Sequence, residues 1–232
     1  MAKKKFALNN SYFRNRQAGD PETPSEVVSY FMEHGELPFR YDGDNWAYDM
    51  VCERQKRRGV IHGQYLTPDT TARRMAELAF RFTDVRTALD ACCGTGQITG
   101  ALLGRGFEVR AFDIDLEMLA VHKYLYPQVG AVQGSFDDWR GADTHSLIVS
   151  NPPYEMDRIT VFMDWLACRL EPRGKAVLLV PSGFIDKTRP RKLAQTLSRF
   201  CVLHREPMAE PFERTNTRAE ILVLELLENY DR

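Results

Sequence analysis

The residues best suited to chemistry are Asn151, Pro152 and Tyr154, which belong to the tetrapeptide Asn-Pro-Pro-Tyr. They follow the apolar run 146–150, a predicted buried strand that must end here because proline cannot donate a ladder hydrogen bond. The asparagine amide oxygen and the next backbone carbonyl can both accept from one amino group. A tyrosine ring adds a face on which a planar group can stack. The tetrapeptide predicts a site for a planar NH2 group, with an ordinary strand-ending turn as the equal alternative.

A second candidate element is the glycine-rich segment 88–96, in which an apolar strand leads into Gly94 and Gly96. Glycines at such a turn let the backbone bend sharply and approach a ligand. The next predicted strand, 107–112, ends at Asp113, whose carboxylate can accept hydrogen bonds from both hydroxyls of a ribose. Its position about twenty residues after the glycines is typical of nucleoside binding. The succession of strand, glycines, helix, strand and carboxylate is more specific than the glycines alone.

A third element is the segment 63–68, which ends in Thr67 and Pro68. Threonine is a good N-cap and proline is favoured in the first helical position, so a helix is expected to begin here. Thr67 can simply cap that helix. Alternatively, Thr67 and the neighbouring amides can bind a small anion, because helix N-termini favour negative charge. These two interpretations stay open.

The elements that must position these residues alternate regularly between strand and helix. Together they predict an α/β fold, a Rossmann-like, doubly wound, mostly parallel sheet of seven strands with a C-terminal antiparallel hairpin. In such sheets ligands bind at the carboxyl ends of the strands. Beyond those already named, strands are expected at 129–133, 175–181, 202–206 and 220–227, and helices at 97–103, 116–124, 159–170 and 191–200.

Residues 1–60 have a different character, and we predict an N-terminal arm and helical segment there, followed by a second domain over 61–232. The first twenty residues are polar, and a capping box at 23–26 opens a helix. A second helix is expected over 50–57. Basic side chains in this segment are candidate contacts to phosphates: Arg14, Arg16, Arg54, Lys56, Arg57 and Arg58.

The composition limits the partners that are expected. The 31 Lys and Arg residues balance 32 Asp and Glu residues, so any nucleic-acid surface must be local. No apolar run approaches the roughly 20 residues that span a bilayer, so no membrane partner is expected. The start of the chain lacks the apolar segment of a secretory signal. Five cysteines without paired metal-ligand spacing favour a cytoplasmic protein with reduced thiols and no metal site.

The three elements resemble those of the class I S-adenosylmethionine-dependent methyltransferases. More narrowly, the chain is similar to the gamma group that methylates the N6 amine of adenine in DNA. That group carries Gly-x-Tyr/Phe-x-Thr-Pro before the glycine-rich loop and Asn-Pro-Pro-Tyr after it. Here the corresponding segments are 63–68, 90–96 and 151–154, in the same order. The resemblance covers residues 60–227 and implies a methyltransferase domain at 61–232 that uses S-adenosylmethionine and binds DNA.

The resemblance also implies roles for individual residues. Thr67 would contact the methionine carboxylate, and Asp113 would hold the ribose. Asn151 and the Pro152 carbonyl would bind the adenine amine, while Tyr154 and Phe212 would stack on a base flipped out of the duplex. A sulfonium methyl is already activated, so alignment of the acceptor matters more than a metal or base. The implied cofactor contacts are Tyr65, Thr67, Asp90, Cys92, Gly94, Gly96, Asp113, Ile114, Ser135, Phe136 and Asn151.

Two features depart from this family. Ser135 stands where many members have an aspartate that contacts the cofactor adenine. Members usually carry a separate target-recognition domain, whereas only residues 155–232 follow Tyr154 and the sheet needs them. A separate specificity subunit is therefore a possible partner. Two alternatives stay open: an acceptor in RNA (adenine or guanine) or a protein glutamine, since Asn-Pro-Pro-Tyr also occurs in such enzymes, and a catalytic or decoy subunit that needs a specificity partner.

Overall fold

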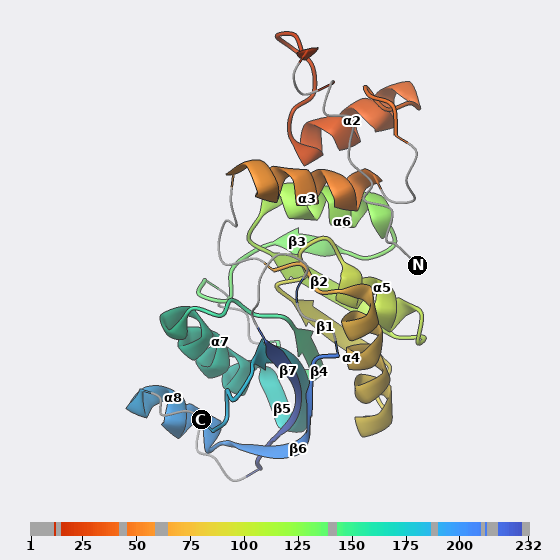
Figure 1. The fold of residues 1–232 in the computed structure, drawn as a ribbon. Helices are drawn as coiled ribbons and strands as arrows, with labels where there is room; N and C mark the ends of the chain where they lie inside the picture. The colour runs from red at the N-terminus through yellow and green to blue at the C-terminus, as the bar shows by residue number, and fades with distance from the viewer. Residues whose placement is uncertain are drawn as a thin grey trace.

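The protein contains one seven-stranded sheet in the order β3-β2-β1-β4-β5-β7-β6, covered by helices on both faces (Figure 1). Strands β1 to β5 run parallel to one another. Strand β7 lies between β5 and β6 and is antiparallel to both. The predicted doubly wound sheet and its antiparallel C-terminal pair are confirmed. The computed structural model describes residues 12, 15–41, 46–58, 65–138, 143–186, 190–209, 212 and 218–228, with 48, 53 and 55–58 described by their backbone alone.

The strand and helix bounds follow the hydrophobic runs of the sequence. The strands are β1 (Thr87–Ala91), β2 (Glu108–Asp113), β3 (Ala131–Gln133), β4 (His145–Ser150), β5 (Leu170–Pro181), β6 (Phe200–Pro207) and β7 (Ala219–Leu226). The helices are α2 (Pro24–His34), α3 (Trp46–Arg58), α4 (Asp69–Phe82), α5 (Gln97–Leu103), α6 (Leu116–Leu125), α7 (Met156–Arg169) and α8 (Arg191–Leu197).

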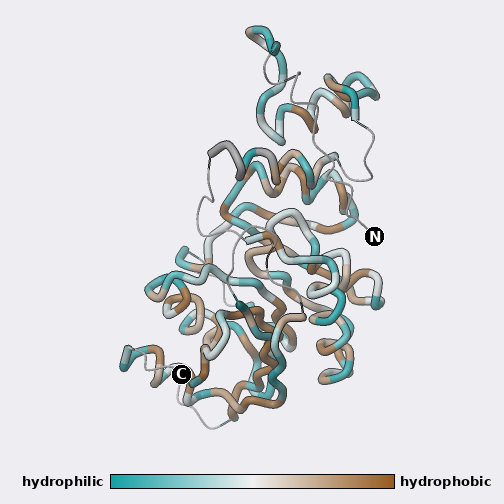
Figure 2. The backbone as a smooth tube through the Cα atoms, viewed as in Figure 1, coloured by the Kyte–Doolittle hydropathy of each residue, from teal (hydrophilic) through white to brown (hydrophobic). Residues whose placement is uncertain are grey.

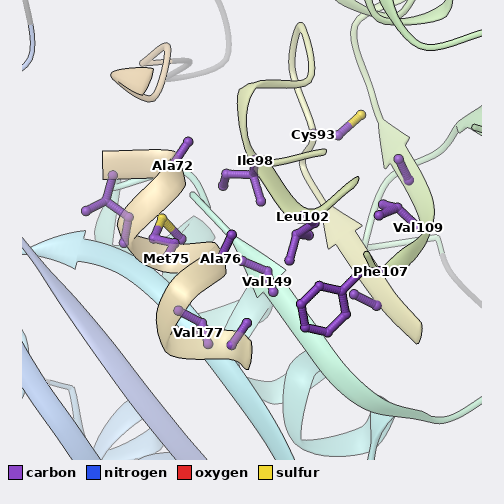
Figure 3. Packing of buried hydrophobic residues seen from close by; sticks show 14 of the residues in the cluster. Ala72, Met75, Ala76, Cys93, Ile98, Leu102, Phe107, Val109, Val149 and Val177 are labelled. Carbon is purple, nitrogen blue, oxygen red and sulfur yellow. The ribbon is translucent and has the colours of Figure 1, made fainter. Parts of the chain in front are cut away.

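Two hydrophobic cores lie on opposite faces of the sheet, because successive strand residues point in opposite directions. In β1, Ala88 joins the core beneath α4 and α5, while Leu89 joins the core beneath α7 and α8. Figure 3 shows Met75 of α4 packed in the first core near Val177 of β5. Hydrophobic residues concentrate in the central strands along the tube of Figure 2. The sheet is thereby fixed from both sides, which holds its carboxyl edge rigid.

The N-terminal helices form an extra layer over α6, outside the two cores of the sheet (Figure 1). Ala47 and Val51 of α3 are fully buried against Met118 and Val121 of α6. Trp46 packs against Tyr124 with ring centroids 4.9 Å apart. This packing explains why α3 begins at Trp46, four residues before the predicted start: its first turn covers α6.

Several other predicted boundaries differ from the structure, and in three cases a contact made at a distance accounts for the difference. Helix α4 begins at Asp69 with Pro68 as its N-cap residue, and Thr67 caps nothing because its hydroxyl contacts Asn151. Strand β5 begins at Leu170, since Leu170 pairs with His145 across an irregularity in the ladder. Helix α8 ends at Leu197, because Phe200 already pairs with Leu226 of β7.

Candidate active site

The strand register brings the candidate residues to one edge of the sheet. Ala91, the last residue of β1, pairs with Phe112 of β2 and with Ser150 of β4. Asp113 and Asn151 therefore leave the sheet at the same level, on either side of the glycine-rich loop. The strand order reverses between β1 and β4, which is where open α/β sheets bind ligands.

The glycine-rich loop needs glycine at two positions for different reasons. Gly94 and Gly96 have φ angles of 54° and 95°, in the left-handed region. A Cβ atom on Gly96 would lie 2.6 Å from Cε2 of Tyr126, so Tyr126 also requires glycine there. A Cβ atom on Gly94 would meet no described atom within 4 Å. The outer side of Gly94 is thus open to a ligand.

Asp113 sits directly beside this loop, and backbone amides hold its carboxylate. Oδ2 accepts from the amide of Gly94 at 2.8 Å, and Oδ1 accepts from the amide of Asp115 at 2.9 Å. Burial raises the pKa of Asp113, and these two hydrogen bonds oppose that rise. A carboxylate offers about four acceptor positions. The amides of Gly94 and Asp115 occupy two of them, and the backbone of Ile114 also lowers the pKa of this carboxyl, so at least one position is left for a ribose hydroxyl and that role stays a prediction.

Asn151 is fixed in one orientation by the segment that precedes α4. Its Nδ2 donates to the carbonyl of Tyr65 at 2.8 Å and to Oγ1 of Thr67 at 3.1 Å. The carbonyl can only accept, so the NH2 group must face it. The amide oxygen Oδ1 is buried and has no hydrogen-bond partner among the described residues. Leaving a buried acceptor unpaired is costly, and such an atom in a native site calls for a donor.

Replacing Thr67 with valine should lower the rate constant of the reaction at this site about 2- to 10-fold, because one neutral hydrogen bond that orients Asn151 is lost. Single-turnover kinetics with saturating cofactor measure this step. Thr67→Ser keeps the hydroxyl and should stay close to the wild-type rate. If Thr67→Val instead weakens cofactor binding and leaves the rate unchanged, Thr67 acts on the cofactor carboxylate rather than on Asn151.

Three aromatic rings lie next to Asn151. Tyr65, Tyr154 and Phe212 are in mutual contact, with centroids 5.4 to 5.9 Å apart. The Tyr154 hydroxyl is buried without a partner within the described part of the chain, and burial holds the pKa of this phenol well above its ordinary value. Pro152 is buried as well. The predicted stacking residues Tyr154 and Phe212 are therefore in contact with each other, and Tyr154 stays neutral. Phe212 is only 4% exposed and packs in the core on the α4 side, so its stacking role stays a prediction.

Three further predicted cofactor contacts, Ile114, Ser135 and Phe136, differ in their exposure and contacts. Ile114 follows Asp113 and is 42% exposed, so it offers an apolar surface at the edge. Ser135 accepts from the amide of Asp137 and donates to its carboxylate, each at 3.2 Å. Phe136 is buried in the core beneath α7 and α8, where its ring makes an edge contact with the ring of Phe162. Ile114 is thus the exposed apolar side chain of this group, while Phe136 belongs mainly to the core.

A buried polar network beneath the loop was not predicted beyond Asp90 itself. The Thr99 hydroxyl donates to Oδ2 of Asp90 at 2.6 Å and lies 3.0 Å from Nε2 of His122. Because its single proton goes to Asp90, Nε2 of His122 must donate to it. Burial raises the pKa of Asp90 to about 7 and lowers the pKa of His122 to about 4. The only local signal in the sequence was a charged residue within an apolar strand.

These shifts predict opposing effects of pH on stability. Between the ordinary Asp90 pKa of 3.8 and about 7, the folded protein holds the extra proton, so stability falls as pH rises. Between about 4 and the ordinary His122 pKa of 6.5, the unfolded chain holds it, so stability rises. His122→Gln keeps a donor to Thr99 and removes only the second effect. As pH rises from about 4 to 6.5, the free energy of unfolding of His122→Gln should therefore fall relative to that of wild type by about 1.4 kcal/mol per pH unit.

Urea denaturation at a series of pH values measures this difference. Asp90→Asn is the matched control, since it should give a slope of the opposite sign relative to wild type. Parallel pH profiles for His122→Gln and wild type would show that His122 is not held neutral in the folded protein.

The two cysteines of the loop are not built as nucleophiles. Burial raises the pKa of Cys92 and of Cys93 well above the ordinary thiol value, with the nearby Asp113 and Asp90 adding to the rise. A neutral thiol is a poor nucleophile. Cys93 packs in the core on the α4 side of the sheet.

The candidate phosphate contacts fare differently. Arg54 is not available to a phosphate, because its guanidinium is buried in an ion pair with Asp115. Arg16 pairs with Glu22 at 2.9 Å and also donates to the carbonyl of Asp20. The prediction for Arg54 is therefore wrong, because its positive charge is paired with Asp115, which lies outside the N-terminal segment. Arg14 and the side chains of Lys56, Arg57 and Arg58 lie outside the described residues.

Comparison with known proteins defines the fold. The chain superimposes on a candidate class I S-adenosylmethionine-dependent methyltransferase from Listeria monocytogenes, with a TM-score of 0.62, 14% identity and coverage of 90% of this chain and 70% of that one. A candidate RNA methyltransferase from Pyrococcus horikoshii gives 0.56, with 17% identity and coverage of 71% and 88%. The glycopeptide N-methyltransferase MtfA, solved with S-adenosylmethionine, gives 0.52, with 16% identity and coverage of 67% and 93%.

The chain therefore has the class I S-adenosylmethionine-dependent methyltransferase fold, as the sequence predicted. The predicted cofactor agrees with these neighbours, one of which was solved with it. No protein-family model and no curated protein sequence matches the chain. In the described part of the chain, no helix combines the length and apolar character needed to cross a bilayer.

Proposed function

We propose that the protein is an S-adenosylmethionine-dependent methyltransferase that acts on the N6 amine of adenine in DNA. The observation that carries the proposal is the buried, unpartnered Oδ1 of Asn151, beside a glycine-rich loop whose outer side is open. An acceptor without a donor, locked in place by two hydrogen bonds, suits an incoming N–H group. The Thr-Pro element before the loop favours adenine in DNA among the acceptors that Asn-Pro-Pro-Tyr sites use.

The residues present fit the proposed cofactor. Asp113 keeps acceptor positions for the ribose hydroxyls, Gly94 leaves room for close approach of a ligand, and Ile114 offers an exposed apolar side chain for the adenine. When bound, S-adenosylmethionine supplies an electrophilic methyl group on a positively charged sulfur. No acid is needed to activate such a group, so the protein's task is alignment of the acceptor.

Asn151 performs the central part of that task. Its Oδ1 accepts a hydrogen bond from the substrate amine, and the Pro152 carbonyl is positioned next in sequence to accept another. Two such bonds turn the amine so that its lone pair faces away from both acceptors. Positive charge grows on the nitrogen as it attacks, and both bonds then strengthen, which stabilises the transition state more than the ground state. The S–C bond would break with its electron pair left on a neutral sulfur, and the methylated amine would release one proton to solvent. Because Asn151 is held by Tyr65 and Thr67, this orientation exists before the substrate arrives.

Methyl transfer with labelled S-adenosylmethionine tests the acceptor. The protein is incubated separately with duplex DNA, RNA and a protein extract, and each product is digested and analysed by mass spectrometry. The proposal requires N6-methyladenine in the DNA digest, absent when Asn151→Ala replaces wild type. Methylated adenine or guanine in RNA alone would move the substrate to RNA, the kind of substrate in the description of the Pyrococcus neighbour. Methylated glutamine alone would move it to protein.

Arg54 is paired with Asp115, so phosphate contacts in the N-terminal segment must come from its other basic side chains. Contacts from residues 1–60 to phosphates would weaken binding by about 0.9 log unit per log unit of salt for each phosphate neutralised. The slope of DNA affinity against salt concentration gives the number of phosphates neutralised. Methylation of DNA that appears only after a second subunit is added would assign DNA binding to that partner.

A further inference from the structure

Arg54 of α3 reaches across to the start of α6. Nη2 of its guanidinium lies 2.8 Å from Oδ2 of Asp115, and Nη1 lies 3.3 Å from Oδ1. The two side chains are only 7% and 9% exposed. This is a buried, bidentate ion pair between a residue of the N-terminal helices and the residue two positions after Asp113.

Asp115 links this ion pair to the candidate ribose site. Its backbone amide donates to Oδ1 of Asp113, while its own carboxylate caps α6 by accepting from the amides of Glu117 and Met118. The turn 113–115 therefore has one end in the site and the other end held by Arg54. The residue that Arg54 binds through its side chain is thus the one whose amide positions the Asp113 carboxylate.

Attachment of α3 to the rest of the protein does not explain this ion pair. The apolar residues Ala47 and Val51 already bury themselves against α6. Ser25 of α2 makes a second, separate polar contact, donating from its amide and hydroxyl to Glu117 at 2.8 Å each. Replacing a buried ion pair by apolar residues is often neutral or stabilising, so the pair is a poor device for docking. What a planar guanidinium provides instead is a fixed geometry for both carboxylate oxygens.

We infer that Arg54 is a positioning residue for cofactor binding: it holds Asp115, and through the Asp115 amide it sets the Asp113 carboxylate that receives the ribose. The inference rests on the proposed function, because it assumes that Asp113 binds a nucleoside. It also gives the N-terminal helices a role in the cofactor site, although no residue of theirs need touch the cofactor.

The test compares two ligands on wild type, two Arg54 variants and one control variant. Isothermal titration measures the affinity of S-adenosylhomocysteine and of its 2′,3′-dideoxy analogue for wild type, Arg54→Lys and Arg54→Met. Ser25→Ala is the matched control, because it removes a contact to the same turn of α6 without touching Asp115. Thermal unfolding followed by circular dichroism confirms that each variant is folded.

The decisive quantity is the ratio of the two dissociation constants. Wild type should prefer the ribose form by about 10²-fold, the size expected for two charge-assisted hydrogen bonds. Arg54→Met should reduce that ratio about tenfold, and Arg54→Lys, whose single ammonium cannot hold both oxygens, about threefold. Ser25→Ala should keep the wild-type ratio. A purely structural role would weaken both ligands equally and leave the ratio unchanged.

The outcomes separate the two proposals. An unchanged ratio in Arg54→Lys overturns the inference even if Arg54→Met does not fold, while cofactor binding by wild type leaves the proposed function standing. A reduced ratio in the Arg54 variants with a normal ratio in Ser25→Ala supports it. Wild type that binds neither ligand overturns the proposed function, and the inference falls with it.

Discussion

Replacing Asn151 with alanine is expected to lower the rate constant for methyl transfer by about 10²-fold or more, while cofactor affinity stays within about twofold of wild type. The loss is large because Oδ1 of Asn151 is the preorganised acceptor for charge that develops on the substrate nitrogen. Its Nδ2 is already bound to Tyr65 and Thr67, so no reorganisation is needed when the substrate arrives. Single-turnover kinetics and calorimetric titration measure the two quantities separately.

A remote amide provides the control for this experiment. Gln195 is exposed on α8, far along the chain from the site, and Gln195→Ala should retain full activity. Circular dichroism should show that Asn151→Ala is folded, because the substitution also removes an unpaired buried acceptor. Retained turnover in Asn151→Ala would remove the central claim of the proposed mechanism.

Replacing Asp113 with alanine is expected to weaken S-adenosylmethionine binding by about 10²-fold, which corresponds to a few kcal/mol for a pair of charge-assisted hydrogen bonds. The substitution also deprives the amides of Gly94 and Asp115 of their acceptor. The loop and the turn at 113–115 should therefore lose their relative positions, which adds to the loss of direct contact. Calorimetric titration gives the dissociation constant.

Asp113→Asn separates these two contributions. Asparagine can keep one of the two backbone hydrogen bonds but presents an NH2 group in place of the other acceptor. Its affinity should lie between those of wild type and Asp113→Ala. Equal cofactor affinity in Asp113→Ala and wild type would show that the ribose is bound elsewhere or that the cofactor class is wrong.

The sequence predicted the sheet well because its signals are local. Apolar runs such as 146–150 and 175–181 are short, and glycine or proline ends each of them, so they identify strands without any knowledge of their neighbours. The alternation with helices then leaves few topologies, since parallel strands need helical crossovers. The gathering of Asp113 and Asn151 at one edge followed from the same rule, because Asp113 is the last residue of β2 and Asn151 directly follows β4.

The errors arose where one side chain can serve two partners. Thr67 precedes a proline and has the chemistry of a helix cap, yet its hydroxyl accepts from Asn151, which lies 84 residues away in sequence. Arg54 belongs to a basic cluster that was a candidate for phosphate contact, yet it pairs with Asp115, 61 residues away. Local propensity cannot choose between a nearby and a distant partner of equal chemistry.

By itself, the sequence determined the class of sheet, the residues at its carboxyl edge and the chemistry those residues can perform. Only the tertiary structure decided which atoms are already occupied: Nδ2 of Asn151 is bound and Oδ1 is left without a partner among the described residues, and Arg54 is paired with Asp115. It also revealed that Asp90, Thr99 and His122 form one buried network. Hydrophobic periodicity is a property of neighbouring residues, whereas the partner of a polar group depends on which distant segments packing brings within hydrogen-bond distance.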